Sequence, residues 1–351
     1  MTQSLAAPKL AKPKTKKVSL IELNEMMRDV SIPDSAFIPY LTAYRTRSAP
    51  MRPAIIPNSR TVTMSEAEER RVRGAMAMNW ANGVARWRRE QRFNARLQSN
   101  DPILVSEGDS WFQFPFFLDD VIDQLGSSYN VLSTCAAGDT VKRMLGPAPD
   151  YLRSLRRLRA DGKKVCALLF SGAGNDFIDV LAGKGAELPI VNLFSAGKPA
   201  SWYLRNAAFD AKVAFIDAAL RSFLQTVRQE FPGLPVVLHG YDYPIPAMKQ
   251  GDWRNPQWTK IDAWLAGPMT KRRIVDHKLQ SEIVRELIDR HNAMLKQIAS
   301  AFSNTHYIDL RGVVTPHTMW ADEIHPTNNG FALVAGKFLA TLKQIGCGGA
   351  P

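Results

Sequence analysis

Five residues in four widely separated blocks of the sequence are of the types that acyl transfer needs. They are Ser110 in Gly-Asp-Ser, Gly138 in Cys-Ala-Ala-Gly-Asp, Asn175 in Gly-Ala-Gly-Asn-Asp, and Asp322 and His325 in Asp-Glu-Ile-His-Pro. A serine hydroxyl attacks an ester carbonyl when an imidazole takes its proton and a carboxylate orients that imidazole. The predicted oxyanion hole consists of the backbone N–H groups of Ser110 and Gly138 and the Asn175 amide. Together the blocks contain every role that a serine hydrolase requires.

The loop that carries His325 also holds the carboxylate best placed to orient it. Asp322 precedes His325 by three residues, so both side chains can point the same way, and we favour it over Asp309. Asp109 and Asp176, in the first and third blocks, are interpreted as turn-stabilising carboxylates that accept nearby backbone N–H groups.

Five short apolar segments predict the strands that position these blocks. They are Ile103–Val105, Tyr129–Ser133, Val165–Phe170, Pro235–His239 and His306–Leu310. Helical segments follow them: Phe116–Leu125, Thr140–Ala160, Phe209–Phe231, His277–Phe302 and Asn328–Ile345. This alternation predicts an α/β fold, a three-layer α/β/α flavodoxin-like sandwich with a five-stranded, mainly parallel sheet. Because ligands bind at the carboxyl ends of the strands in such sheets, the four blocks are expected to meet there.

The order and content of the four blocks resemble those of the SGNH (GDSL) hydrolase superfamily. The resemblance covers about Asp101 to Gly346. It implies a serine ester hydrolase of the esterase, lipase or lysophospholipase type, which acts through an acyl-enzyme on Ser110. His325 would be its base and Asp322 the orienting residue.

The first ~100 residues have no counterpart in the minimal fold of that family. We expect a disordered basic tail at 1–20, an arm with a helical extension at 21–100, and the hydrolase domain at 101–351. Within the extension, Ser65 and Glu68 form a capping-box signature that predicts a long helix to about Leu97, or two helices broken near Asn82-Gly83. Insertions near 178–201 and 244–269 follow the third and fourth strands and are candidate lids.

The sequence indicates the type of reaction more clearly than the ester on which it acts. Five aromatic residues follow the nucleophile: Trp111, Phe112, Phe114, Phe116 and Phe117. Trp111, Phe112 and His239 are candidate substrate-binding residues, and an aromatic acyl pocket would favour a lipid-like ester. The alternatives are that the aromatic residues all pack a helix on the sheet and that His239 belongs to the core.

Other activities of the same site stay open. Four tryptophans in or beside the insertions suit either a lid or a sugar-stacking platform: Trp202, Trp253, Trp258 and Trp264. Carbohydrate O-deacetylation and acyl transfer to an alcohol or sugar therefore remain alternatives, as does a non-catalytic binding or effector protein. No His/Cys/Asp cluster has metal-ligand spacing, so neither metal nor cofactor is expected.

Charge and composition restrict the partners. Of the 351 residues, 45 are Lys or Arg and 33 are Asp or Glu, and five of the lysines lie in the first seventeen residues. The other basic groups, Arg86–Arg96, Arg153–Lys164 and Lys271–Arg273, are interpreted as solvated helix faces, so no nucleic acid is expected. A small-molecule or lipid ester is the expected substrate, peripheral membrane contact stays open, and the oligomeric state is undetermined.

Cysteine usage and hydropathy bear on the compartment. Three cysteines, Cys135, Cys166 and Cys347, argue against a disulfide framework. The apolar stretches fall far short of the ~20 residues that a membrane-spanning helix needs, and no secretory signal is evident. A reduced cytoplasmic location is the simplest expectation, although signal-independent export stays open.

Overall fold

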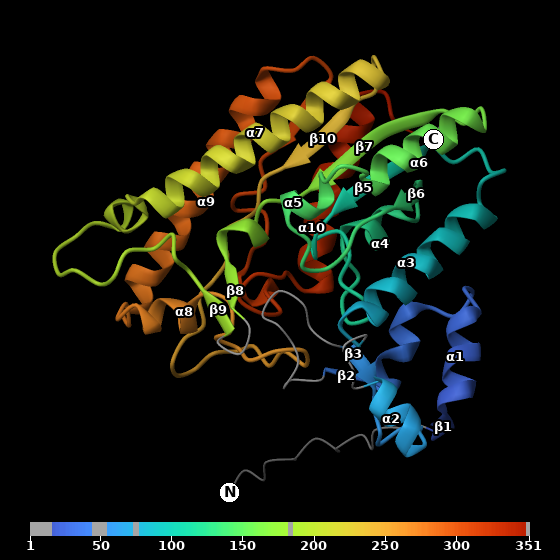
Figure 1. Cartoon of the computed structure of the whole chain (residues 1–351), viewed down its shortest axis with the longest axis horizontal. Helices are drawn as coiled ribbons and strands as arrows, with labels where there is room; N and C mark the ends of the chain where they lie inside the picture. The colour runs from blue at the N-terminus through green and yellow to red at the C-terminus, as the bar shows by residue number, and fades with distance from the viewer. Residues whose placement is uncertain (1–15, 44–54, 73–76, 182–184, 349–351) are drawn as a thin grey trace, which may run out of the picture.

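A five-stranded parallel sheet lies at the centre of the computed structural model (Figure 1). Its strands are β5 (Ile103–Gly108), β6 (Asn130–Ser133), β7 (Val165–Ser171), β10 (Val236–His239) and β11 (Thr305–Ile308). Their order across the sheet is β6-β5-β7-β10-β11, and every neighbouring pair is parallel. Numbered along the chain, this order is 2-1-3-4-5, the flavodoxin-like arrangement. The predicted fold class and all five predicted strands are confirmed.

The structure describes four stretches of the chain. These are residues 16–43, 55–72, 77–181 and 185–348. Most of the predicted basic tail, residues 1–15, lies outside the described residues, as do residues 182–184 of the first insertion.

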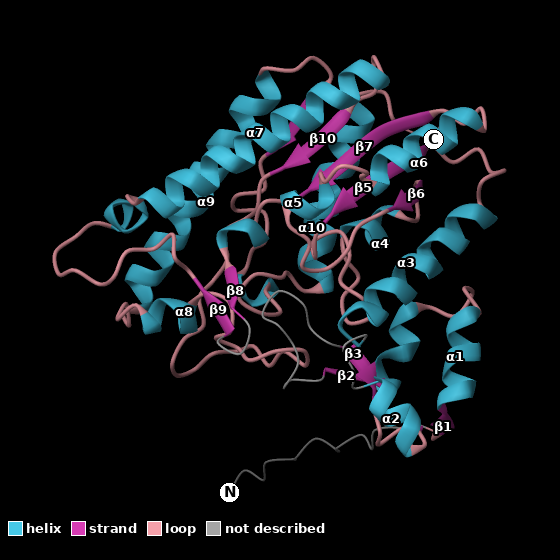
Figure 2. Ribbon diagram, in the orientation of Figure 1, coloured by secondary structure: helices cyan, strands magenta, loops and turns pink. Residues whose placement is uncertain are grey.

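Helices cover both faces of the sheet (Figure 2). On one face α4 (Val121–Leu125) packs against α10 (Asn328–Gln344). The other face carries α6 (Asp150–Ala160), α7 (Ala207–Glu230) and α9 (His277–Ser300). The aromatic ring of Phe223 on α7 lies 4.9 Å from that of Phe170 on β7 and 5.2 Å from that of Tyr151 on α6. The strands are apolar on both sides because both sides are buried in this way.

Two predicted helices are shorter than expected. The segment predicted as a helix from Phe116 is helical only in α4, because Phe116 has a left-handed backbone (φ 66°) and Asp120 caps the first turn. The segment predicted as one helix from Thr140 forms α5 (Val141–Met144) and α6. Gly146, Pro147 and Pro149 separate these two helices, and Pro149 is the residue that precedes the first turn of α6.

The amino-terminal extension forms small elements around one long helix. They are β1 (Val18–Ser19), α1 (Leu20–Arg28), η1 (Asp34–Tyr40), β2 (Leu41–Ala43), β3 (Ile55–Pro57), β4 (Val62–Thr63), α2 (Glu66–Val72) and α3 (Ala77–Ala95). The capping box before α2 is confirmed: Ser65 N donates to Glu68 Oε2 at 2.7 Å and Glu68 N to Ser65 Oγ at 3.3 Å. The break predicted near Asn82-Gly83 is wrong, because α3 continues through both residues.

Helix α3 connects the extension to the sheet through two adjacent buried arginines. Arg88 pairs with Asp34 at 2.8 Å and also donates to three backbone carbonyls of the extension. Arg89 donates to the Phe112 carbonyl at 2.6 Å and to Asp120 at 2.6 Å. The interpretation of the basic group Arg86–Arg96 as a solvated helix face is therefore wrong for Arg88 and Arg89. The charges of these two residues are compensated inside the fold, where a lone cation would be costly.

Two of the three cysteines are joined, contrary to expectation. Cys166 at the start of β7 and Cys347 after α10 form a disulfide, whereas Cys135 is a free, buried thiol. Spacing along the chain could not indicate this pair, because the two residues are 181 positions apart and meet only through the fold. The cysteine argument for a reducing compartment therefore no longer holds. Among the described helices, none is both long and apolar enough to span a bilayer.

The buried Arg89–Asp120 pair yields a stability prediction. Arg89→Met should lower the free energy of unfolding by about 3–5 kcal/mol, because it leaves the Asp120 carboxylate buried without a cation. Adding Asp120→Asn should restore part of that loss, as measured by urea unfolding. Arg70→Met, which breaks the exposed Arg70–Glu66 pair, serves as a control and should change the stability by less than about 1 kcal/mol. A double variant that is no more stable than Arg89→Met would contradict this account.

Candidate active site

Ser110, His325 and Asp322 form a continuous chain of hydrogen bonds. Ser110 Oγ lies 2.7 Å from His325 Nε2, and His325 Nδ1 lies 2.6 Å from Asp322 Oδ2. Ser110 follows β5, whereas the other two residues lie in the loop before α10. All three side chains are almost completely buried. A hydroxyl, an imidazole and a carboxylate in this order can move a proton away from the oxygen of the serine.

Asp322 is held in its charged form by the groups around it. Burial alone would raise its pKa, but His325 and the donors Ile324 N and Trp258 Nε1 hold the pKa of Asp322 below its ordinary value. The Trp258 contact, at 2.7 Å, comes from the second insertion, and sequence reasoning missed it. Asp309, the weaker candidate, instead accepts two hydrogen bonds from the guanidinium of Arg311 and one from its backbone N–H.

The turn that carries Ser110 is fixed from several directions. Gly108 is required there, because a Cβ on it would lie 2.8 Å from the Cβ of Ser171 at the end of β7. Asp109 accepts hydrogen bonds from Trp111 N at 3.0 Å, from Ser171 Oγ at 2.9 Å and from the Tyr241 hydroxyl at 2.5 Å. The turn-stabilising interpretation of Asp109 is confirmed. It also holds for Asp176, whose carboxylate accepts the Val141 N–H at 3.0 Å.

The two neighbours of Gly138, Ala137 and Asp139, are each held by hydrogen bonds from an asparagine side chain. The φ of Gly138, 78°, is in the left-handed region, which favours glycine. Asn82 of α3 exchanges two hydrogen bonds with the backbone of Ala137, at 3.1 and 3.2 Å. On the other side, Asn175 Nδ2 donates to the Asp139 carbonyl at 2.7 Å. This hydrogen bond brings the second and third sequence blocks together and leaves Asn175 a second N–H group to donate.

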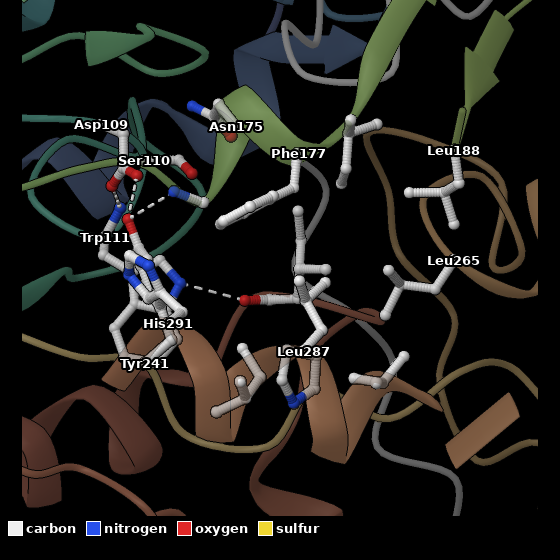
Figure 3. Close-up of a pocket in the computed structure, with 16 residues that line it drawn as sticks. Asp109, Ser110, Trp111, Asn175, Phe177, Leu188, Tyr241, Leu265, Leu287 and His291 are labelled. Carbon is white, nitrogen blue, oxygen red and sulfur yellow. Dashed lines mark hydrogen bonds between the residues drawn. The ribbon is translucent and has the colours of Figure 1, made fainter. Parts of the chain in front are cut away.

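A cavity of about 70 Å³ opens beside Ser110 (Figure 3). Most of its lining is aliphatic or aromatic. Besides Trp111, the apolar residues come from the segment after β7, both insertions, α9 and the loop before α10: Phe177, Ile178, Leu188, Pro244, Leu265, Val284, Leu287, Ile288 and Ile324. Asn175 also lines it. An apolar cavity next to a serine hydroxyl suits the acyl chain of an ester.

The three predicted substrate-binding residues have different positions. Trp111 lines the cavity and donates from its indole nitrogen to the Ile324 carbonyl at 3.1 Å. Phe112 and His239 do not line it, so their assignment is corrected. Their rings lie 5.4 Å apart, and each contacts Phe338 of α10 in the core. Burial lowers the pKa of His239 to about 4, which agrees with the alternative of a neutral core histidine.

The remaining aromatic residues after Ser110 are also buried. The Phe114 ring lies 4.7 Å from the imidazole of His325, and the Trp264 ring lies 5.9 Å from it. Phe116 contacts Phe37 of the extension, and Phe117 contacts Trp258. Phe114 and Trp264 thus pack against the imidazole, and Phe116 connects the extension to the segment after Ser110.

The second insertion is anchored by a buried carboxylate that sequence reasoning missed. Glu323, next to Asp322, accepts the backbone N–H groups of Ala247, Trp264, Leu265 and Ala266 at 2.7–2.8 Å. The loop that bears His325 is thereby tied to the segment that supplies Leu265 to the cavity. In the part of the chain that the structure describes, no group of three or more His, Cys, Asp and Glu side chains could hold a metal ion.

Comparisons with known proteins give structural similarity only. No family model matches the chain, and no curated protein matches it. Solved structures that resemble it include a protein from Streptococcus pneumonia named for platelet activating factor, with 14% identity over 77% of this chain and 98% of that chain and a TM-score of 0.41.

Two further solved structures carry enzyme names. An extracellular lipase from Streptomyces rimosus has 14% identity over 70% of this chain and 99% of its own, with a TM-score of 0.39. A carbohydrate esterase family 2 enzyme from Corynascus thermopiles has 12% identity over 70% and 66%, with a TM-score of 0.37. GDSL-like lipases and an acyltransferase are also among these structures.

Glu107, beneath the Ser110 turn, yields a pH prediction. Burial raises the pKa of Glu107 to about 8, against an ordinary value of 4.5, although Thr134 donates to it. Between pH 4.5 and pH 8, Glu107 therefore keeps its proton in the folded protein but loses it in the unfolded chain. Because the folded state binds more protons in this range, this group makes the free energy of unfolding fall as pH rises from about 4.5 to about 8. Glu107→Gln, which resembles the protonated acid, should flatten that part of the stability curve in urea unfolding at several pH values. An unchanged slope would contradict the assignment.

Proposed function

We propose that this chain is a serine ester hydrolase of the SGNH (GDSL) type. The observation that carries the proposal is the hydrogen-bonded series from Ser110 through His325 to Asp322, next to an apolar cavity. The motif order, the 2-1-3-4-5 parallel sheet and the position of the site at the carboxyl ends of its strands support it.

In the proposed reaction, Ser110 Oγ attacks the ester carbonyl while its proton passes to His325 Nε2. Asp322 stays ionised, accepts the hydrogen bond from Nδ1–H and stabilises the imidazolium. The imidazolium then gives its proton to the departing alcohol, which leaves an acyl group on Ser110. Water attacks this acyl-enzyme while His325 takes its proton; the bond between the acyl carbon and Ser110 Oγ then breaks as His325 returns that proton to Oγ, and the acid is released.

The oxyanion of the tetrahedral intermediate would be held by the N–H groups of Ser110 and Gly138 and by the Asn175 amide. The ties of Asn82 to Ala137 and of Asn175 to Asp139 support this assignment, because donors fixed before the reaction need no reorganisation during it. Each donor would be worth about 3–4 kcal/mol of transition-state stabilisation.

The cavity lining favours an ester with an apolar acyl chain over an acetyl ester. Its walls are mostly aliphatic and aromatic, so acyl carbons that enter it leave water, at about 0.8 kcal/mol for each buried methylene group. Trp258 and Trp264, which could have formed a sugar-stacking platform, are instead buried around Asp322 and His325. Of the activities left open by the sequence, lipid-like ester hydrolysis is the one that these contacts support.

The nucleophile assignment is tested with a serine variant. Ser110→Ala should abolish turnover of p-nitrophenyl esters and labelling by a fluorophosphonate probe, because it removes the only oxygen proposed to attack. Ser127→Ala, at an exposed position outside the site, is the matched control and should keep both. The proposal of a serine ester hydrolase would be excluded if the wild type never turned over short, medium or long acyl esters faster than Ser110→Ala does.

The base and the orienting residue should differ in their effects. Asp322→Asn should lower kcat less than His325→Ala, because the imidazole survives as a base when only its orienting partner is changed. Steady-state kinetics on the best ester of the chain-length series would measure both losses. Equal losses would contradict the role given to Asp322.

A further inference from the structure

We infer that two neighbouring segments beside the cavity form a surface that docks on an anionic lipid bilayer. The apolar part of this basic–apolar patch consists of Leu193, Phe194 and Val275. Its basic part consists of Lys198, Lys271, Arg272, Arg273 and Lys278. The inference goes beyond the proposed function, and its binding test does not require catalysis.

The apolar part is unusually exposed and lies on two segments that touch. Val275 is 75% exposed, Leu193 is 61% exposed and Phe194 is 48% exposed. Phe194 N donates to the Arg272 carbonyl at 2.9 Å, and Val275 follows Arg272 by three residues. Single exposed apolar residues are ordinary on protein surfaces, but an apolar group gathered from two segments and bordered by polar residues indicates an interaction site.

Buried or hydrogen-bonded neighbouring residues fix the backbone beside these exposed side chains. Ile274, next to Val275, is fully buried, and its N–H donates to the Met269 carbonyl at 3.1 Å. Asn192, next to Leu193, donates its backbone N–H to the Tyr203 carbonyl at 2.8 Å and its side-chain amide to the Trp202 carbonyl at 2.9 Å. The apolar tips therefore project from fixed backbone.

The basic residues around the exposed apolar side chains favour an anionic partner. Residues 193–198 and 271–278 together contain five Lys or Arg residues and one acidic residue, Asp276, whose carboxylate caps α9. A second acid, Glu282, lies 3.9 Å from Lys278. Lysine is depleted in protein–protein interfaces, whereas Lys and Arg around apolar side chains are typical of surfaces that dock on anionic lipid.

The segments that carry the patch also supply residues to the cavity walls. Leu188 precedes the first segment by five residues, and α8 (Ala266–Lys271), which begins directly after Leu265, leads into the second. Val284 lies about 10 Å along α9 from its first residue, His277. These elements lie on the side of the molecule opposite α3 (Figure 1). A bilayer bound there would lie next to the segments that supply Leu188 and Leu265 to the cavity.

Vesicle sedimentation tests the inference directly. The full chain should bind vesicles of phosphatidylglycerol and phosphatidylcholine in equal parts, should bind pure phosphatidylcholine vesicles much more weakly, and should lose affinity as salt is added. The triple variant Leu193→Ser, Phe194→Ser, Val275→Ser should bind the mixed vesicles at least about tenfold more weakly. Arg273→Glu with Lys278→Glu should also weaken that binding, by at least about fivefold for each basic side chain.

A matched variant elsewhere controls for general effects. Leu333 is 42% exposed on α10, and Lys337 is exposed one turn further along the same helix. Leu333→Ser with Lys337→Glu should bind the mixed vesicles like the wild type. Ser110→Ala should also bind them normally, so a failure of the proposed catalysis would be distinguishable from a failure of docking.

Three outcomes would overturn the inference. The first is no binding of the wild type to the mixed vesicles. The second is an equal loss of binding in the α10 control. The third is a wild-type dimer in sedimentation velocity that the triple variant abolishes, without vesicle binding, because the patch would then be a contact between copies of this chain.

Discussion

The hydrogen bond between Ser110 and His325 is the contact on which the rest of the site depends. It joins residues 215 positions apart, so it exists only if the first strand and the loop after the last strand end at the same edge of one sheet. Parallel strands with helical crossovers meet that condition, because every strand then ends at that edge. The 2-1-3-4-5 order puts β5 and β7 side by side, which brings the Ser110 turn next to the Asn175 segment.

The amino-terminal extension restrains the same edge from outside the sheet. Along α3, Asn82 holds Ala137 beside Gly138, Arg86 donates to the Thr134 carbonyl at 2.6 Å, and Arg89 holds the Phe112 carbonyl after Ser110. Two loops that carry proposed site residues are therefore tied to one rigid helix. A five-stranded sheet alone leaves such loops exposed, and in this chain the extension braces them instead.

The sequence was informative where a local pattern determines the structure. Uniform apolar runs predicted the five strands. Because Ser110, Asp322 and His325 follow the ends of such strands and are of the types that form a catalytic series, the sequence also predicted that these side chains would meet. It was misleading where a contact depends on another part of the fold. The charge of Arg89 indicated a solvated face, yet the residue is buried because Asp120 compensates it. Phe112 follows the proposed nucleophile, but the turn directs it into the core. Nothing near Cys166 could indicate Cys347.

The most direct measurement of the central claim is a crystal structure of the chain after reaction with an alkyl fluorophosphonate. This account predicts phosphorus bonded to Ser110 Oγ, a phosphoryl oxygen within hydrogen-bond distance of the Gly138 N–H and the Asn175 amide, and the alkyl chain in the apolar cavity. A phosphoryl group on another residue, or one on Ser110 with its oxygen turned away from both donors, would contradict it.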